Sequence, residues 1–144
     1  MTKSDFNRRL LTTFIDRVWN QRDIESAGEF VAPIYTVRHD PGDAWHMRDL
    51  NLSEFMQRVK TGSAPFPDQK FVLLDILASE HTIFVNWTWT GTHLADLGDF
   101  PPTGKLISMS GLTLYDVEAN RLRGHWQVAD RLGVYQQLMR NKQN

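Results

Sequence analysis

An acidic side chain beside a tryptophan is the first feature of the sequence that could carry out acid–base chemistry. Residues 121–130 alternate in the manner of a strand, and this alternation places Asp130 on the same face as Trp126. A carboxylate beside an indole on a buried face is costly to ionise, so its pKa rises toward the range useful for general acid–base catalysis. Asp130 also stands where it can cap the helix that we expect to follow. The sequence leaves both roles open.

Two histidines lie at positions where a strand can present them to the same site. His93 follows the predicted strand 82–92, and His125 lies within 121–130. An imidazole can exchange protons near neutral pH, although a strand histidine is more often a packing residue with one nitrogen hydrogen-bonded. Strict alternation puts His125 on the face opposite Asp130, so only a bulge or a twist brings both to one pocket. Asp130 and His125 are the candidate catalytic residues.

A third cluster has the residue types that bind metal ions: His39, Asp40, Asp43 and His46. The intervening Pro41-Gly42 gives no regular ligand geometry, and the spacing matches no compact metal motif. We therefore interpret this segment as a polar loop at the rim of the sheet and predict neither a metal site nor a cofactor.

Composition narrows the possible chemistry. The 144 residues carry a formal charge of −1 and no cysteine, but include 5 Trp, 3 Tyr and 8 Phe. The near-neutral charge gives no excess of basic residues for binding nucleic acid or an anionic membrane. The lack of cysteine excludes disulfides and thiolate catalysis. The N-terminal segment has no apolar signal-peptide core, so we expect a cytoplasmic protein. The aromatic content requires either a large core or an apolar pocket.

Known catalytic signatures are also missing from the sequence. It contains no glycine-rich phosphate loop, no serine-nucleophile elbow and no zinc-protease motif. If the chain is an enzyme, its residues favour an acid–base catalyst without a cofactor.

The secondary-structure elements that must position these residues are mostly helices in the first part of the chain and mostly strands in the second. Helical periodicity covers residues 4–20, a short helix over 24–30 ends before Pro33, and a brief strand is predicted at 34–37. Asn51 and Glu54 form a capping-box pattern for a helix that includes 52–59. Period-two alternation then predicts strands at 69–78, 82–92, 105–117 and 121–130, and a last short helix begins near Arg131. We predict one α+β domain over residues 1–144, with the helices covering one face of a curved antiparallel sheet.

Within the strand 82–92, alternation separates an aromatic face from a polar one. Trp87, Trp89 and Gly91 share the apolar face, which continues toward His93, and Thr88, Thr90 and Thr92 lie on the other.

The order of several short motifs resembles the SnoaL-like polyketide cyclase (ester cyclase) family of the nuclear transport factor 2-like superfamily. These motifs are residues 87–93 (WTWTGTH), 101–104 (PPTG), Ser110-Gly111, His125-Trp126, and Asp130 followed by residues 131–133 (RLG) and Gln137-Leu138. The motif-bearing part covers about residues 66–139, and residues 35–41 with the helix at 52–59 resemble the upstream half of the family.

The resemblance implies a cone-shaped α+β barrel, with the sheet wrapped around the long first helix and a deep apolar pocket at one end. In the characterised cyclases an aspartate near the end of the last strand removes a proton α to carbonyl groups, and the enolate closes a ring by an intramolecular aldol reaction. Asp130 is the matching residue. The implied pocket-lining residues are Trp87, Trp89, His93, Met109 and Trp126, with His39 near the mouth. The loop after His93 carries Asp96 and Asp99 and is more acidic than is usual for this family.

Three functional hypotheses follow. In the first, the chain is a polyketide-cyclase-like enzyme that acts on an apolar carbonyl compound by proton abstraction, with aldol-type cyclisation or a related isomerisation. In the second, it is a non-catalytic domain that binds a small apolar or aromatic ligand in the same pocket. The third makes the sheet a dimerisation surface with Thr88, Thr90 and Thr92 on its outer face; a homodimer is usual for the superfamily.

Overall fold

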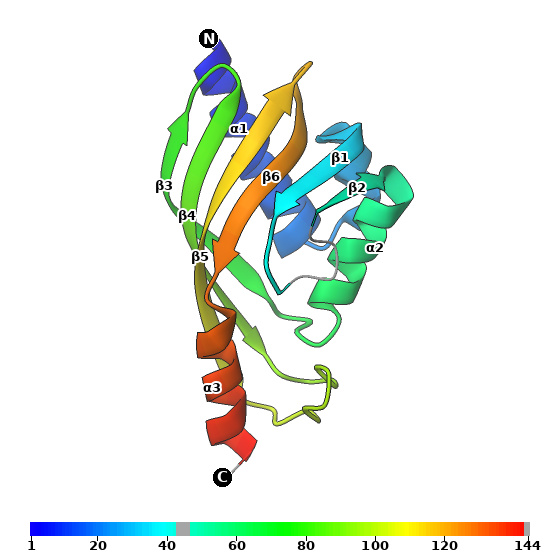
Figure 1. The fold of residues 1–144 in the computed structure, drawn as a ribbon, viewed down its shortest axis with the longest axis vertical. Coiled ribbons are helices and arrows are strands. Elements are labelled where there is room, and N and C mark those ends of the chain that lie inside the picture. Colours follow the sequence, from blue (N-terminus) through cyan, green and yellow to red (C-terminus); the bar gives the residue numbers. More distant parts are fainter. Residues whose placement is uncertain (43–46, 143–144) are drawn as a thin grey trace.

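A mixed, curved sheet forms the body of the molecule in a computed structural model that describes residues 1–42 and 47–142. Its six strands follow the order β2-β1-β6-β5-β4-β3, with edges at β2 and β3, so the sheet is not closed into a barrel. Figure 1 shows α1 crossing the concave side of the sheet and α3 extending from its lower end. The elements are α1 (Lys3–Phe14), η1 (Ile15–Asn20), η2 (Ile24–Glu29), β1 (Val31–His39), β2 (Arg48–Asn51), α2 (Leu52–Ser63), β3 (Lys70–Ala78), β4 (Thr82–Thr92), β5 (Leu106–Glu118), β6 (Arg121–Ala129) and α3 (Arg131–Lys142).

The helices begin where the capping patterns indicate. Thr2 and Asp5 form a capping box at the start of α1, and Asn51 and Glu54 form the predicted one at the start of α2. The helix expected over residues 4–20 is present as α1 followed by the wider π-helical turns of η1. The shorter expected helix at 24–30 is the 3-10 helix η2. None of the described helices is long and apolar enough to cross a membrane.

The four long strands that alternation predicts are all present, but two features of the sheet differ from expectation. The polar segment Arg48–Asn51 forms β2, which was not predicted because three of its four residues are exposed and give no apolar alternation. The sheet was expected to be antiparallel, yet β1 pairs in parallel with β6. Because four strands, β2 to β5, lie between β1 and β6 in the chain, no local turn determines that pairing.

A bulge in β6 changes which of its side chains face the interior. Asp116 pairs with Gly124 whereas Val117 pairs with Leu122, so Arg123 is one extra residue on β6. Leu122 and His125 are therefore both buried, although strict alternation would put them on opposite faces. The expectation that Trp126 lies on a buried face is wrong, because the bulge turns it outward with 40% of its surface exposed. A Cβ at position 124 would collide with the carbonyl oxygen of Thr36 on β1, which explains glycine at the bulge.

Candidate functional site

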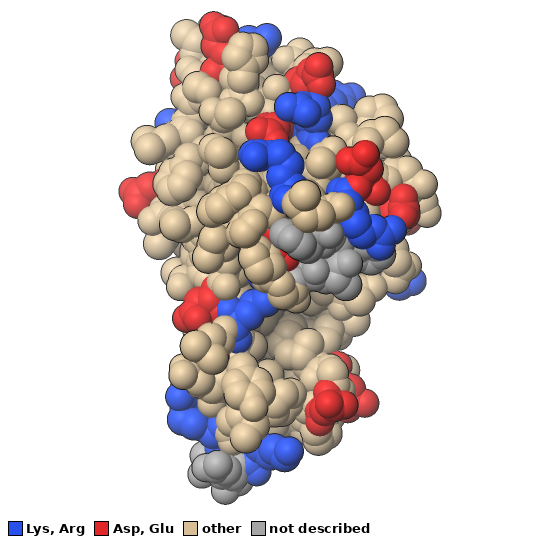
Figure 2. All heavy atoms as spheres, viewed as in Figure 1, with Lys and Arg blue, Asp and Glu red and all other residues tan. Residues whose placement is uncertain are grey.

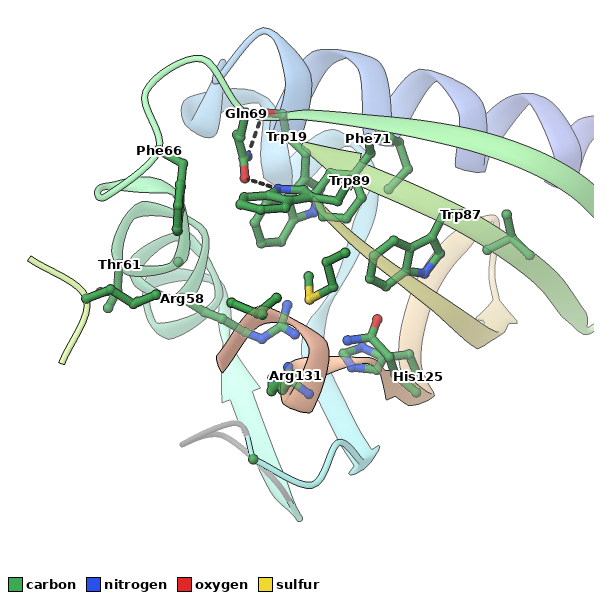
Figure 3. Close-up of a pocket in the computed structure, with 18 of the residues that line it drawn as sticks. Trp19, Arg58, Thr61, Phe66, Gln69, Phe71, Trp87, Trp89, His125 and Arg131 are labelled. Atoms are coloured by element: carbon green, nitrogen blue, oxygen red, sulfur yellow. Dashed lines mark hydrogen bonds between the residues drawn. The ribbon is translucent and has the colours of Figure 1, made fainter. Parts of the chain in front are cut away.

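A cavity of about 840 Å³ lies between the concave face of the sheet and the helices. Figure 3 shows Trp87 and Trp89 extending from β4 into this space, with Trp19 and Phe71 beside them. The face of the molecule seen in Figure 2 is hollowed above its lower end, and charges of both signs are scattered around it. The aromatic lining residues are Phe14, Trp19, Tyr35, Phe55, Phe66, Phe71, Trp87, Trp89, Phe100, Tyr115 and Tyr135. Such a wall suits an apolar, flat ligand.

The two cavity tryptophans of β4 are held by hydrogen bonds from their indole nitrogens. Trp87 Nε1 donates to Thr113 Oγ1 at 2.9 Å, and Trp89 Nε1 donates to Gln69 Oε1 at 2.9 Å. A Cβ at position 111, opposite Trp87 on β5, would overlap the Trp87 ring. Gly111 thus allows the indole to lie flat against the sheet, and both rings have fixed orientations in the wall.

The polar end of the cavity is organised around Asp40, which has no exposed surface. Its Oδ2 lies 3.2 Å from His125 Nε2 and accepts hydrogen bonds from Arg58 Nη2 at 3.2 Å and Gln127 Nε2 at 3.1 Å. Its Oδ1 forms an ion pair with Arg131 Nη1 at 3.0 Å. One buried carboxylate therefore joins β1, α2, β6 and α3.

Opposing effects set the protonation of Asp40. Burial alone raises its pKa, but the hydrogen bond from His125 and the positive charges of Arg131 and Arg58 outweigh burial and hold the pKa below the ordinary value. Asp40 is therefore ionised at neutral pH. A carboxylate that is so stabilised is a poor proton acceptor and a good partner for a positive charge.

Both ring nitrogens of His125 have a hydrogen-bond partner among the described residues. Its Nδ1 lies 2.6 Å from the hydroxyl oxygen of Tyr35, and its Nε2 faces Asp40. Burial raises the pKa of Tyr35 well above its ordinary value, so the hydroxyl stays protonated and is the donor. The ionised carboxylate can only accept. This pair of contacts assigns the proton of the neutral imidazole to Nε2 and leaves Nδ1 as the acceptor.

A second branch connects this cluster to the aromatic wall. Thr113 Oγ1 accepts from Trp87 and donates to Gln127 Oε1 at 2.8 Å, and Gln127 in turn donates to Asp40. Tyr35, His125, Gln127 and Trp87 all line the cavity. These polar groups therefore form one connected network, which fixes their orientation before any ligand binds.

The structure brings some of the predicted site residues together and separates others. Trp87, Trp89, Met109 and His125 line the cavity. His93 is buried beside Phe66, with Nδ1 3.3 Å from Thr103 Oγ1, and is not among the described lining residues. Trp126 and His39 stack on each other, with ring centroids 4.5 Å apart, and neither is among those lining residues.

Asp130 lies apart from the cavity and from His125. Its Oδ1 accepts a hydrogen bond from Gly133 N at 2.9 Å, which is the N-cap contact of α3. It lines a shallower hollow of about 580 Å³ on the outer face of the sheet, with Leu74, Leu112 and Val128. The bulge in β6 does not bring the two residues together, because it lies before both of them.

Several residues of the polar cluster were missed at the sequence level. The sequence pattern places Asp40 in a polar loop at the rim of the sheet and gives no signal that Arg58, Arg131 and Tyr35 belong to a site. The available signal for Asp40 was its position directly after β1. Its burial and its hydrogen-bond partners follow from the tertiary fold. Asp43 and His46 lie outside the described residues. The described part of the chain contains no group of three or more histidine and carboxylate side chains arranged to hold a metal ion.

Comparisons with known proteins agree with this architecture. The chain matches the family model of SnoaL-like polyketide cyclases over residues 9–138. A crystallised protein of Acidithiobacillus ferrooxidans assigned as a polyketide cyclase is 47% identical, with a TM-score of 0.92 over 98% of this chain and 99% of that one. No curated protein sequence matches the chain significantly.

More distant structures share the fold. IdmH of Streptomyces antibioticus, assigned as a polyketide cyclase, is 24% identical, with a TM-score of 0.77 over 96% of this chain and 99% of that one. AclR of Streptomyces galilaeus, assigned as a hydroxylase, is 19% identical, with a TM-score of 0.76 over 93% of this chain and 96% of that one. Because proteins assigned to different reactions have this fold, the reaction must be inferred from the site itself.

Proposed function

Because the chain belongs to the SnoaL-like polyketide cyclase family, we propose that it is an acid–base catalyst that works without a cofactor on an apolar carbonyl compound. The reaction removes a proton α to the carbonyl, and the enolate then closes a ring by an aldol-type step or is reprotonated elsewhere as an isomerisation. The observation that supports this proposal is the hydrogen-bonded chain Tyr35–His125–Asp40, in which Tyr35 and His125 line the aromatic cavity and Asp40 lies buried behind them.

His125 is the base in this scheme. Its Nδ1 accepts from the Tyr35 hydroxyl, so a substrate proton reaches it when the Tyr35 oxygen takes that proton and passes its own to Nδ1. The high pKa of Tyr35 disfavours a separate phenolate, which makes the two transfers concerted. Proton, charge and atoms balance: the substrate becomes an enolate and His125 becomes an imidazolium.

Asp40 is the positioning partner of that base. Its carboxylate stays ionised and faces Nε2, where it holds the imidazole in the required tautomer and stabilises the imidazolium once it forms. The aromatic wall supplies the remaining requirement, because Trp87 and Trp89 give the cavity apolar surface and provide flat faces for an aromatic substrate.

For Asp130 we propose a structural role. The family resemblance predicts it as the base, but its carboxylate caps α3 and lies on the outer face of the sheet. Its involvement in catalysis remains a prediction that substitution can test, because Asp130→Asn keeps an oxygen able to accept from Gly133 while removing the charge.

The test is exchange of α protons into deuterated water. 2-Tetralone is a flat apolar ketone with acidic α protons, and NMR follows its deuteration directly. We expect the protein to accelerate exchange roughly 100-fold or more over buffer, as a positioned general base does. Tight binding of 2-tetralone, seen by quenching of tryptophan fluorescence, without any acceleration would contradict the proposal and favour a binding domain.

A further inference from the structure

One tyrosine of the cavity wall has a hydroxyl group that the protein itself does not use. Tyr115 lies on β5, lines the cavity and is 8% exposed. Its hydroxyl has no hydrogen-bond partner in the described part of the chain. The oxygen is also not fully enclosed by protein atoms, in contrast to another unpartnered polar atom, His93 Nε2. The Tyr115 oxygen therefore keeps exposed surface, and the space that Tyr115 lines is the cavity.

Tyr115 stands next to the proposed base. It pairs with His125 across the β5–β6 ladder, and the two rings meet edge to face with their centroids 6.0 Å apart. Tyr35, whose hydroxyl donates to His125, comes from β1 on the other side of β6. Three neighbouring strands thus bring Tyr35, His125 and Tyr115 to one part of the cavity wall.

The two tyrosines are close enough to affect each other's ionisation. Burial is the main cause that raises the pKa of Tyr35, and the neighbouring Tyr115 is the next. Burial likewise raises the pKa of Tyr115 above its ordinary value. Both phenols therefore keep their protons at neutral pH and are hydrogen-bond donors. Tyr35 donates to His125, whereas the proton of Tyr115 is available to a ligand in the cavity.

Proton abstraction α to a carbonyl needs such a donor beside the base. When the α proton leaves for the Tyr35–His125 pair, the C–H electrons form a carbon–carbon double bond and the carbonyl π electrons move onto the oxygen. That oxygen is bonded to the carbon next to the α carbon, so the negative charge develops close to the departing proton. A hydrogen bond aimed at the oxygen stabilises the transition state more than the ketone, because the charge appears only during the reaction.

We propose that Tyr115 is a further catalytic residue, whose hydroxyl donates a hydrogen bond to the carbonyl oxygen of the substrate while the enolate forms. This inference rests on the proposed function, because it assigns a second role in the same reaction. It also restricts the ligand: a molecule that fills the cavity covers the Tyr115 oxygen and must present an acceptor there, or it leaves a donor unsatisfied. A ketone with an acidic neighbouring C–H group meets both requirements.

Isotope-edited infrared spectroscopy tests this hydrogen bond without turnover. The probe is 2-tetralone labelled with carbon-13 at its carbonyl, because a hydrogen bond to the oxygen lowers the C=O stretching frequency. We expect the frequency for bound 2-tetralone to lie below its value in cyclohexane and to return toward that value in Tyr115→Phe. Tyr35→Phe is the matched control, since it removes the same atom from a hydroxyl that donates to His125 and should keep the low frequency. Equal frequencies in wild type and Tyr115→Phe would overturn the proposal.

Kinetics and stability separate a catalytic hydroxyl from a structural one. Tyr115→Phe should lower kcat for α-proton exchange about 100-fold, as loss of one oxyanion donor does, and should change KM by less than about 10-fold. Because no described residue binds this hydroxyl, its loss should change Tm by no more than about 2 °C. Tyr35→Phe leaves the buried His125 without its donor and should lower Tm by more. A loss of Tm in Tyr115→Phe as large as in Tyr35→Phe would contradict the proposal.

The two proposals can fail separately. If Tyr115→Phe raises the stretching frequency but the wild type catalyses no exchange, the hydrogen bond to the carbonyl stands and the proposed reaction fails. If the wild type catalyses exchange and Tyr115→Phe does so at the same rate, the proposed reaction stands and the catalytic role of Tyr115 is refuted.

Discussion

Replacement of Asp40 by asparagine should destabilise the fold strongly at neutral pH. Asp40 is fully buried and contacts Arg58, Arg131 and His125. Asparagine keeps the shape and can still accept hydrogen bonds, but it leaves the largely buried Arg58 charge opposite a neutral group. Removing one partner of a buried ion pair typically costs 3–5 kcal/mol, and partial exposure of Arg131 argues for the lower end, about 3 kcal/mol. For a chain of this size that is a loss of roughly 10 °C in Tm.

The pH dependence of that loss has a defined sign. The pKa of Asp40 is lower in the folded protein than in the unfolded chain. Its ionised form therefore stabilises the fold fully above the unfolded-state pKa, and this contribution disappears as the pH falls through the lower folded-state pKa. The stability difference between wild type and Asp40→Asn should be constant from about pH 7 to pH 5 and should shrink toward about pH 3.

Urea unfolding at each pH measures this difference. Asp116→Asn is the matched control, because Asp116 pairs with Arg38 at 2.7 Å at a more exposed position, and its loss should be smaller. The reasoning is refuted if Asp40→Asn costs less than about 1 kcal/mol at pH 7, or if its cost does not change on acidification.

Three further substitutions test other parts of the structure. Gly133→Ala would push a methyl group into the Asp130 carboxylate and disrupt the cap of α3, which should lower the free energy of unfolding by about 1 kcal/mol in thermal unfolding. Proton exchange should be retained, and its loss would contradict a purely structural role of Asp130. Gly111→Ala would displace the Trp87 ring and should cost about 1–3 kcal/mol by overpacking, with a shift in tryptophan fluorescence; an unshifted spectrum would argue against the fixed indole. The outer face exposes Leu74, Leu112 and Val128, so we predict a homodimer by sedimentation that Val128→Glu converts to a monomer; a monomeric wild type at micromolar concentration would contradict this.

The sequence predicted most of the fold because its elements are encoded locally. The capping box at Asn51 and Glu54 and the alternation of β4 and β5 each depend on residues close together in the chain. Thr88 is exposed on the outer face, as alternation predicts. The strand β2 was missed because three of its four residues are exposed and show no apolar alternation, and the parallel pairing of β1 with β6 was missed because it joins segments distant in the chain.

The site was harder to predict, because one extra residue in a strand moves every later side chain of that strand to the opposite face of the sheet. The bulge at Arg123 turns His125 toward the interior and Trp126 toward solvent, and no local sequence pattern predicts the bulge. Asp40 follows the end of a strand in a polar segment and resembles a loop residue. Its burial depends on Arg58 and Arg131, which α2 and α3 bring to it only in the folded chain.

The measurement that tests the central claim most directly is the rate of α-proton exchange from 2-tetralone in two single variants. If the base is His125 inside the cavity, His125→Gln should lower the rate at least about 100-fold, whereas Asp130→Asn should leave it within about 3-fold of wild type. Loss of exchange in Asp130→Asn with normal exchange in His125→Gln would contradict the account.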